Sequence, residues 1–227
     1  MYNLLIENKE LLKFAYGLII AIICFIIVLR ADKLFKLSLH QGIRYFRNAF
    51  FFYGIAFIIR YFCGAFFCYN LIPNSYNFLT NLIFEYFLII AGFFLLYSLL
   101  WKRIESQKEE NYSSLLNARI FVFYIMALIL VLLDFIWQTY HFMFISQVVL
   151  FLFASIISYS NYLEKGNKHK FTRYYFIAML LSFVAWLLNS LAALYFNWNQ
   201  NIIIGIYCIN IIIFLLFLWG VIRVTKR

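Results

Sequence analysis

Charged residues are scarce in this sequence of 227 residues, at 12% of the total, and hydrophobic residues make up 66%. An ordinary soluble domain is about a quarter charged and a little under half apolar. A globule of this size keeps a large exposed area, so it cannot hide that much apolar surface from water. The composition therefore excludes an ordinary soluble domain and predicts a protein whose outer surface contacts lipid.

Proline and glycine are scarce too, with one proline and eight glycines in the whole chain. Pro73 lies between apolar runs, so we expect no proline kink within a membrane-spanning helix. No two glycines have the Gly-xxx-Gly spacing that brings helix backbones together, so large side chains are expected to fill the helix contacts. Transporters often break their helices at glycine or proline, and this scarcity weakens a transporter interpretation.

Motifs for catalysis, metal binding and cofactor attachment are also missing. The four cysteines form no Cys-x-x-Cys pair, and the three histidines fall in segments expected on opposite sides of the membrane, which argues against a zinc site. No serine stands in a Gly-x-Ser-x-Gly setting, no glycine-rich phosphate loop occurs, and the last apolar run has no lysine for a retinal Schiff base. We expect no cofactor and no metal, and the sequence offers no support for an enzyme.

Seven apolar runs are long enough to cross a bilayer, which takes roughly 20 residues of helix. They lie at about 11–29, 45–66, 80–101, 119–138, 142–162, 173–196 and 201–222. Backbone that faces lipid has to satisfy its own hydrogen bonds, so each run is predicted to be a helix. The sequence predicts an all-α membrane protein, a seven-transmembrane-helix bundle that forms a single transmembrane domain over residues 1–227.

The basic residues predict the orientation of this bundle. Sixteen of the 19 lysines and arginines lie after the first, third and fifth runs and in the C-terminal tail, whereas the other side carries Lys9 and Lys13. By the positive-inside rule, the N-terminus lies outside and the C-terminus lies in the cytoplasm of a cell membrane. The net charge of +10 therefore reflects topology and not nucleic-acid binding. No basic stretch precedes the first run and no small-residue cleavage site follows it, so we expect this helix to remain in the mature protein.

Lipid is the partner that this composition implies, and the basic loops are suited to anionic lipid or a cytoplasmic protein. The oligomeric state stays open.

Between Ala49 and Gly220, and outside the segments expected to face the cytoplasm, the charged residues are Arg60, Glu85 and Asp134. Each charge is costly in lipid. At the rise of an α-helix, these residues lie about 6, 7 and 9 Å outward of the bilayer midplane, respectively. Two amides and a tryptophan fall near the same level. We therefore predict a polar pocket in the outer half of the membrane. Its candidate ligand or ion pocket residues are Arg60, Glu85, Asp134, Gln147, Trp186 and Asn189.

Three interpretations of the charged residues remain open. Arg60 and Glu85 form an interhelical ion pair that only fixes packing, or all three residues surround a ligand or ion. In the third interpretation, each side chain reaches the headgroups separately, and Asp134 is the best placed to do so near a helix end.

The second predicted helix resembles a segment of small microbial seven-helix membrane proteins of the broad sensor, opsin and transporter-like type. The residues that carry this resemblance are 42–62, GIRYFRNAFFFYGIAFIIRYF. It covers about a tenth of the chain, implies the seven-helix architecture and transfers no functional residue.

Two functions fit these observations. The first is a sensor or receptor-like module that binds a small ligand or ion in the outer polar pocket. The alternative is a small proton- or cation-coupled transporter of three plus one plus three helices, suggested by a faint likeness between residues 81–103 and 201–223.

Overall fold

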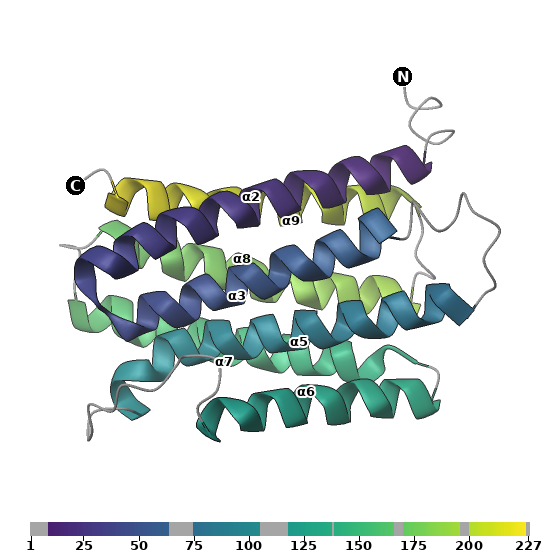
Figure 1. Cartoon of the computed structure of the whole chain (residues 1–227). Helices are drawn as coiled ribbons and strands as arrows, with labels where there is room; N and C mark the ends of the chain where they lie inside the picture. The colour runs from purple at the N-terminus through teal and green to yellow at the C-terminus, as the bar shows by residue number, and fades with distance from the viewer. Residues whose placement is uncertain are drawn as a thin grey trace.

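The computed structural model describes residues 9–63, 75–104, 118–137, 139–165, 170–195 and 200–225, and all regular structure within these ranges is helical. Its elements, labelled as in Figure 1, are α2 (Lys9–Ser38), α3 (Gln41–Phe57), the π-helical segment η1 (Ile58–Cys63), α5 (Ser75–Ile104), α6 (Ala118–Trp137), α7 (His141–Lys165), α8 (Lys170–Tyr195) and α9 (Gln200–Thr225).

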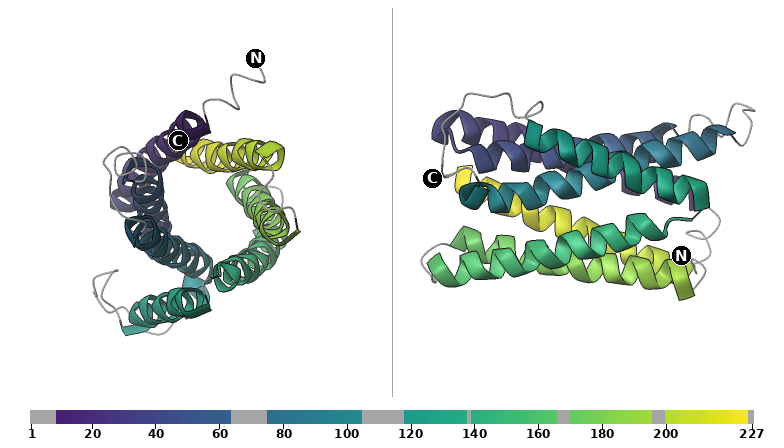
Figure 2. Two further views of the ribbon diagram at one scale, coloured as in Figure 1. Left: turned by 90° about the vertical axis from the view of Figure 1, so that its right-hand side faces the viewer. Right: turned by 90° about the horizontal axis from the view of Figure 1, so that it is seen from below.

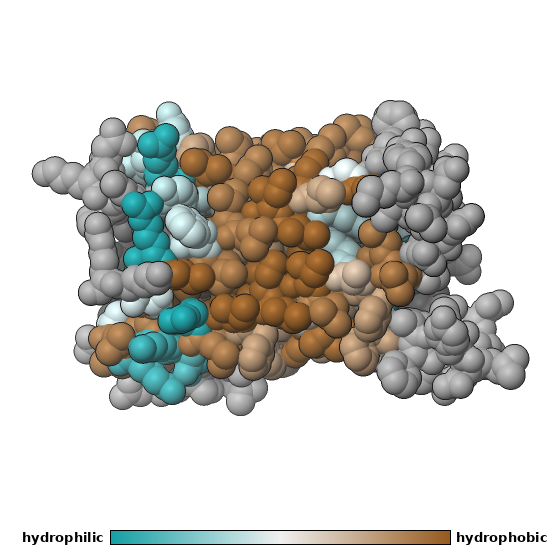
Figure 3. Space-filling model, turned by 90° about the horizontal axis from the view of Figure 1, so that it is seen from above, coloured by the Kyte–Doolittle hydropathy of each residue, from teal (hydrophilic) through white to brown (hydrophobic). Residues whose placement is uncertain are grey.

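Six of these helices, α2 and α5 to α9, are long and apolar enough to cross a membrane. The protein is therefore a multi-pass helical membrane protein. The remaining helix, α3, has 17 residues and continues directly into η1. Apolar side chains are exposed on the outside of the bundle, and hydrophobic residues form a band across its middle (Figure 3). Hydrophilic residues gather at the end of the bundle where α2 stops.

Six helices form a closed ring, in the order α2, α3, α5, α7, α8 and α9, and α9 returns to contact α2 (Figure 2). The ring has two walls: α2, α3 and α5 make one, and α7, α8 and α9 make the other. The remaining helix, α6, lies outside the ring and packs mainly against α5 and α7. The chain therefore passes from one wall to the other through a peripheral helix.

Aromatic side chains fill one end of the ring. Phe50 contacts Phe217 across it at 5.2 Å between ring centroids, and Phe46 contacts Tyr175 at 5.8 Å. Tyr175 in turn lies 5.9 Å from Phe217. Offset and edge-on ring pairs of this kind stabilise a core beyond the area they bury. We call Phe46, Phe50, Tyr175 and Phe217 the aromatic floor, and it joins α3 of one wall to α8 and α9 of the other.

The first helix extends further than the sequence predicted, because α2 continues past its apolar run to Ser38. Asp32 supports this extension by pairing with Lys36, one turn later, at 3.0 Å, and also with Arg47 on α3. Leu39 then ends the helix with a positive φ of 51°, and its N–H donates to the Phe35 carbonyl at 2.8 Å. These contacts fix the corner between α2 and α3 at the end of the bundle opposite the cavity described next.

Candidate functional site

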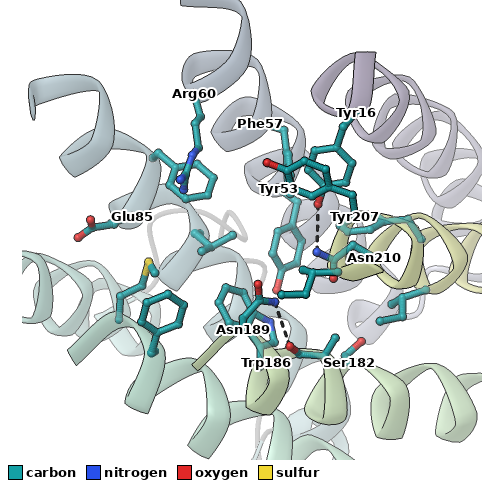
Figure 4. Close-up of a pocket in the computed structure, with 18 of the residues that line it drawn as sticks. Tyr16, Tyr53, Phe57, Arg60, Glu85, Ser182, Trp186, Asn189, Tyr207 and Asn210 are labelled. Atoms are coloured by element: carbon teal, nitrogen blue, oxygen red, sulfur yellow. Dashed lines mark hydrogen bonds between the residues drawn. The ribbon is translucent and has the colours of Figure 1, made fainter. Parts of the chain in front are cut away.

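A cavity of about 380 Å³ lies inside the ring, above the aromatic floor. All six ring helices and η1 contribute to its lining (Figure 4). Two floor residues, Phe50 and Phe217, close it at one end. Its polar side chains gather at the other end, which we call the mouth, where α2 and α9 begin and α8 stops. Cavities of this size accommodate small organic molecules.

Aromatic rings form much of the cavity wall, and several are held by one another. Tyr16 stacks on Tyr207 at 4.1 Å and meets Phe57 edge-on at 5.8 Å. The Asn210 side chain donates a hydrogen bond to the Tyr16 hydroxyl at 3.1 Å, so α2 and α9 are joined by both contacts (Figure 4). The buried Tyr53 hydroxyl also belongs to a residue of the lining, and it has no hydrogen-bond partner in the described part of the chain. A buried hydroxyl left unpaired is costly, which makes it a candidate to bond a ligand or water.

Arg60 lies at the mouth, in the π-helical segment η1. Its guanidinium lies 4.4 Å from the centre of the Phe84 ring, and the residue is exposed. Arg60 makes no ion pair within the described ranges, so the interhelical Arg60–Glu85 pair considered from the sequence is wrong. Stacking on an aromatic face leaves the edges of the guanidinium, which carry its N–H donors, open to other partners.

The position of η1 depends on a close approach to α2. A Cβ atom built on Gly17 would lie 2.4 Å from the Tyr61 Cβ, closer than side chains pack. Glycine therefore allows η1 to lie against α2 and brings Tyr61 within 5.5 Å of the Tyr16 ring. π-Helical turns are rare and frequently occur at functional sites, and here the turn carries Arg60.

Glu85 is 2% exposed and lines the main cavity, but it also lines a second cavity between α5, α6 and the turn that precedes α7. Its Oε2 is buried without a hydrogen-bond partner among the described residues. In Figure 4 the carboxylate is turned away from Arg60 and from the aromatic wall. Glu85 and Arg60 therefore both line the main cavity, but their charged groups have different surroundings.

Asp134 does not line the main cavity. Its carboxylate accepts hydrogen bonds from the backbone N–H groups of Phe142 and Met143, at 3.0 and 2.7 Å, and from the Thr139 hydroxyl at 3.4 Å. These N–H groups belong to the first turn of α7, where helix N–H groups lack partners within the helix and the helix dipole favours a negative charge. The residue is 3% exposed, so the interpretation that it reaches the headgroups is wrong.

The three remaining candidate residues have different surroundings. Trp186 lines the cavity and stacks on Phe151, with ring centroids 6.4 Å apart. Asn189 also lines the cavity, and its side-chain amide donates to the Ala185 carbonyl at 2.9 Å. Gln147 is fully buried between α5 and α7, where it donates to the Leu88 carbonyl at 3.4 Å, and it is not among the residues of the lining.

The structure thus brings four of the six candidate residues to one cavity, namely Arg60, Glu85, Trp186 and Asn189. Several lining residues were missed from the sequence, including Tyr16, Tyr53, Ser182 and Tyr207. Tyrosine is common in the chain, at 18 residues, so its presence in a span carries little signal. Only the rotation of each helix about its axis separates lining tyrosines from lipid-facing ones.

No group of three or more histidine, cysteine, aspartate or glutamate side chains suited to a metal ion occurs within the residues that the structure describes. The cavity combines apolar aromatic walls with a few fixed polar groups, which is the usual chemistry of a small-molecule site. Comparison with protein-family models, with curated proteins and with solved structures finds no match for this chain.

Proposed function

We propose that this protein is a membrane sensor or receptor-like module that binds a small amphipathic anion in the main cavity. The observation that carries the proposal is the cavity itself, which has aromatic walls, polar groups at the mouth and a floor of packed rings. A pocket closed at one end suits binding better than passage. The volume of about 380 Å³ lies near the lower end of the range for small-molecule pockets, about 300–1,000 Å³, so the ligand is small.

The distribution of polar groups in the main cavity supports a small amphipathic anion as the ligand. An apolar or aromatic body fits between Trp186 and the rings that line the α2–α9 side. The Tyr53 hydroxyl, buried without a partner in the described ranges, supplies one hydrogen bond deeper in the cavity. Arg60 supplies a guanidinium group at the mouth, and the paired N–H donors of a guanidinium bind a carboxylate well.

The topology completes this proposal. α3 and η1 together form a seventh span, the N-terminus lies outside and the C-terminus lies in the cytoplasm of a cell membrane. The mouth then opens outward, because it lies opposite the α2–α3 corner with its basic residues. The positive-inside rule supports this orientation. The basic cytoplasmic end meets anionic lipid or a protein partner, which would receive the signal.

Binding is tested with three probes that share one phenyl ring and one alkyl chain: phenylbutyrate, phenylbutanol and phenylbutylamine. Purified protein is heated in detergent with each probe, and the thermal midpoint is followed together with tryptophan fluorescence. We expect phenylbutyrate to stabilise most. Arg60→Gln should weaken phenylbutyrate binding roughly 10- to 100-fold, the value of one charge-assisted hydrogen bond.

The control is Arg44→Gln. The Arg44 guanidinium also lies over an aromatic ring, Phe35 at 5.7 Å, but belongs to the opposite end of the bundle. It should leave phenylbutyrate binding unchanged. Equal stabilisation by all three probes, or equal loss in both arginine variants, would contradict the anionic ligand. Binding that survives Ala185→Trp, which fills the cavity from α8, would contradict the cavity as the site.

A transporter remains the second candidate, because the ring consists of two three-helix walls with α6 outside. This arrangement supports the three-plus-one-plus-three plan. The aromatic floor weighs against it, since it closes the cavity toward the other end. Flux of phenylbutyrate into liposomes along a proton gradient, abolished by Glu85→Gln, would favour transport over sensing.

A further inference from the structure

A second cavity, of about 310 Å³, lies beside the first, between α5, α6 and the turn that precedes α7. We call it the side cavity. Its lining residues are Asn81, Leu82, Glu85, Asp134, Phe135, Thr139 and Tyr140. The polar groups in this set are two carboxylates, one amide, one hydroxyl of threonine and one phenol, so they present mainly oxygen. Oxygen ligands of this kind are the ones that hard cations prefer.

The Glu85 carboxylate is the buried group of the side cavity that lacks a hydrogen-bond partner among the described residues. It is 2% exposed, its Oε2 is buried, and within the described residues it forms no hydrogen bond and no ion pair. The basic residues that line the main cavity with Glu85 are Lys13 and Arg60. The Glu85 carboxylate is turned away from Arg60 (Figure 4). A buried polar atom without a partner is costly, and in folded proteins it points to a water or an ion.

Asp134 supplies the second negative group and still has acceptor capacity. A carboxylate has about four lone-pair positions, and three hydrogen bonds from Thr139, Phe142 and Met143 occupy part of them. The hydrogen bonds to α7 hold this carboxylate in one orientation. The side cavity therefore has one carboxylate on α6 that is fixed by the first turn of α7, and one carboxylate on α5 that has no partner among the described residues.

We infer that the side cavity binds a hydrated monovalent cation of the size of sodium between Glu85 and Asp134. The charges favour a single positive charge over two, because the N-terminus of α7 contributes about half a positive charge at Asp134 and Arg60 lies at the neighbouring mouth. Calcium takes six to eight oxygen ligands, commonly from several carboxylates, and the described ranges offer no cluster of three acidic, histidine or cysteine side chains here. A bound cation joins α5 to the turn between α6 and α7.

The test measures the thermal midpoint of the full chain in detergent at fixed pH and fixed ionic strength, as sodium chloride replaces choline chloride. Ligand that binds only the folded state raises the midpoint, by on the order of 5–10 °C at a hundredfold excess over the dissociation constant. We expect a saturable rise with sodium in the wild type and none in Glu85→Gln. The glutamine variant should fold well, because a neutral amide replaces the buried charge.

One control variant and one variant of the cavity lining complete the test. Glu164→Gln removes an exposed acid from the far end of α7 and should keep the full sodium response. Asn81→Leu removes a lining amide and should weaken the response without abolishing it.

Equal midpoints in sodium and choline would overturn the inference. A sodium response that persists in Glu85→Gln would overturn it as well, and so would a response to calcium alone. If Glu85→Gln stabilises the protein equally in every salt, Glu85 carries a proton and not a cation, and the inference is wrong. None of these outcomes depends on an organic ligand in the main cavity, so they are independent of the proposed function.

Discussion

Removing the Asp134 carboxylate should destabilise the junction between α6 and α7 more than a typical substitution on a spanning helix. Asp134→Ala deletes the acceptor of two backbone N–H groups in the first turn of α7, at Phe142 and Met143. Asp134 and Met143 are buried, so bulk solvent has little access to the N–H groups that lose this acceptor. The expected effect is therefore larger than the loss of an exposed cap.

The magnitude follows from two contributions. Loss of an N-terminal cap costs about 0.5–2 kcal/mol. A buried donor left without a partner costs about 1–3 kcal/mol. Because the two estimates overlap, Asp134→Ala should lower the free energy of unfolding by about 2–4 kcal/mol, which corresponds to roughly 5–15 °C in thermal midpoint for a chain of this size. Asp134→Asn keeps one acceptor oxygen and loses the charge, so it should cost roughly half as much.

The assay combines reversible unfolding in mixed micelles with amide hydrogen exchange at single residues. Exchange at Phe142 and Met143 should accelerate in Asp134→Ala, whereas the middle of α7 should keep its protection. A control at the other end of the bundle is Asp32→Asn, which removes the ion pairs with Lys36 and Arg47 but caps no helix. The reasoning is refuted if Asp134→Ala unfolds within about 0.5 kcal/mol of the wild type, the scatter of an ordinary surface change.

Two further predictions concern backbone sites. Gly17→Ala places a methyl group 2.4 Å from the Tyr61 Cβ, so it should lower the free energy of unfolding by about 1–3 kcal/mol and displace η1. The control is Gly205→Ala, whose methyl group meets no atom within 4 Å, so this variant should be neutral or stabilising. Equal midpoints for the two variants in thermal unfolding would contradict the close approach of η1 to α2. Leu39→Gly removes the steric cost of a left-handed backbone conformation at the end of α2, so it should raise the free energy of unfolding by about 1 kcal/mol in the same assay. Leu39→Ala keeps a Cβ atom and should not raise it. A loss of stability with glycine would argue against the positive φ.

The helices themselves were largely predictable from the sequence, because apolar runs of spanning length have few other stable conformations in lipid. Six of the predicted runs correspond to helices that are long and apolar enough to cross a membrane. The extension of α2 to Ser38 was not predicted, since hydropathy falls where the charged residues begin. There the helix is held by contacts of Asp32, one of them to a residue of another helix.

The candidate site was predictable in depth but not in direction. Alternating helix directions and a fixed rise place Arg60 and Glu85 at a common level, and both do line one cavity. Depth says nothing about rotation about the helix axis. Gln147 therefore shares that level and yet packs between α5 and α7.

Asp134 shows a second reason why the site could not be derived in full. Its partners are backbone N–H groups that follow a short turn, and no side-chain pattern identifies them in advance. The π-helical turns of η1 are similar, because they lie where Tyr61 closely approaches Gly17 of α2, and local residue preference does not reveal a contact between two helices.

The aromatic floor gives the ring unequal stiffness along its length. At the floor, rings from α3, α8 and α9 meet across the centre, so a change of diameter there has to separate close-packed side chains. At the mouth the same helices border empty volume. The mouth should consequently change its width more easily than the floor. We expect an occupant that draws the walls of the mouth together to tilt the helices about the floor.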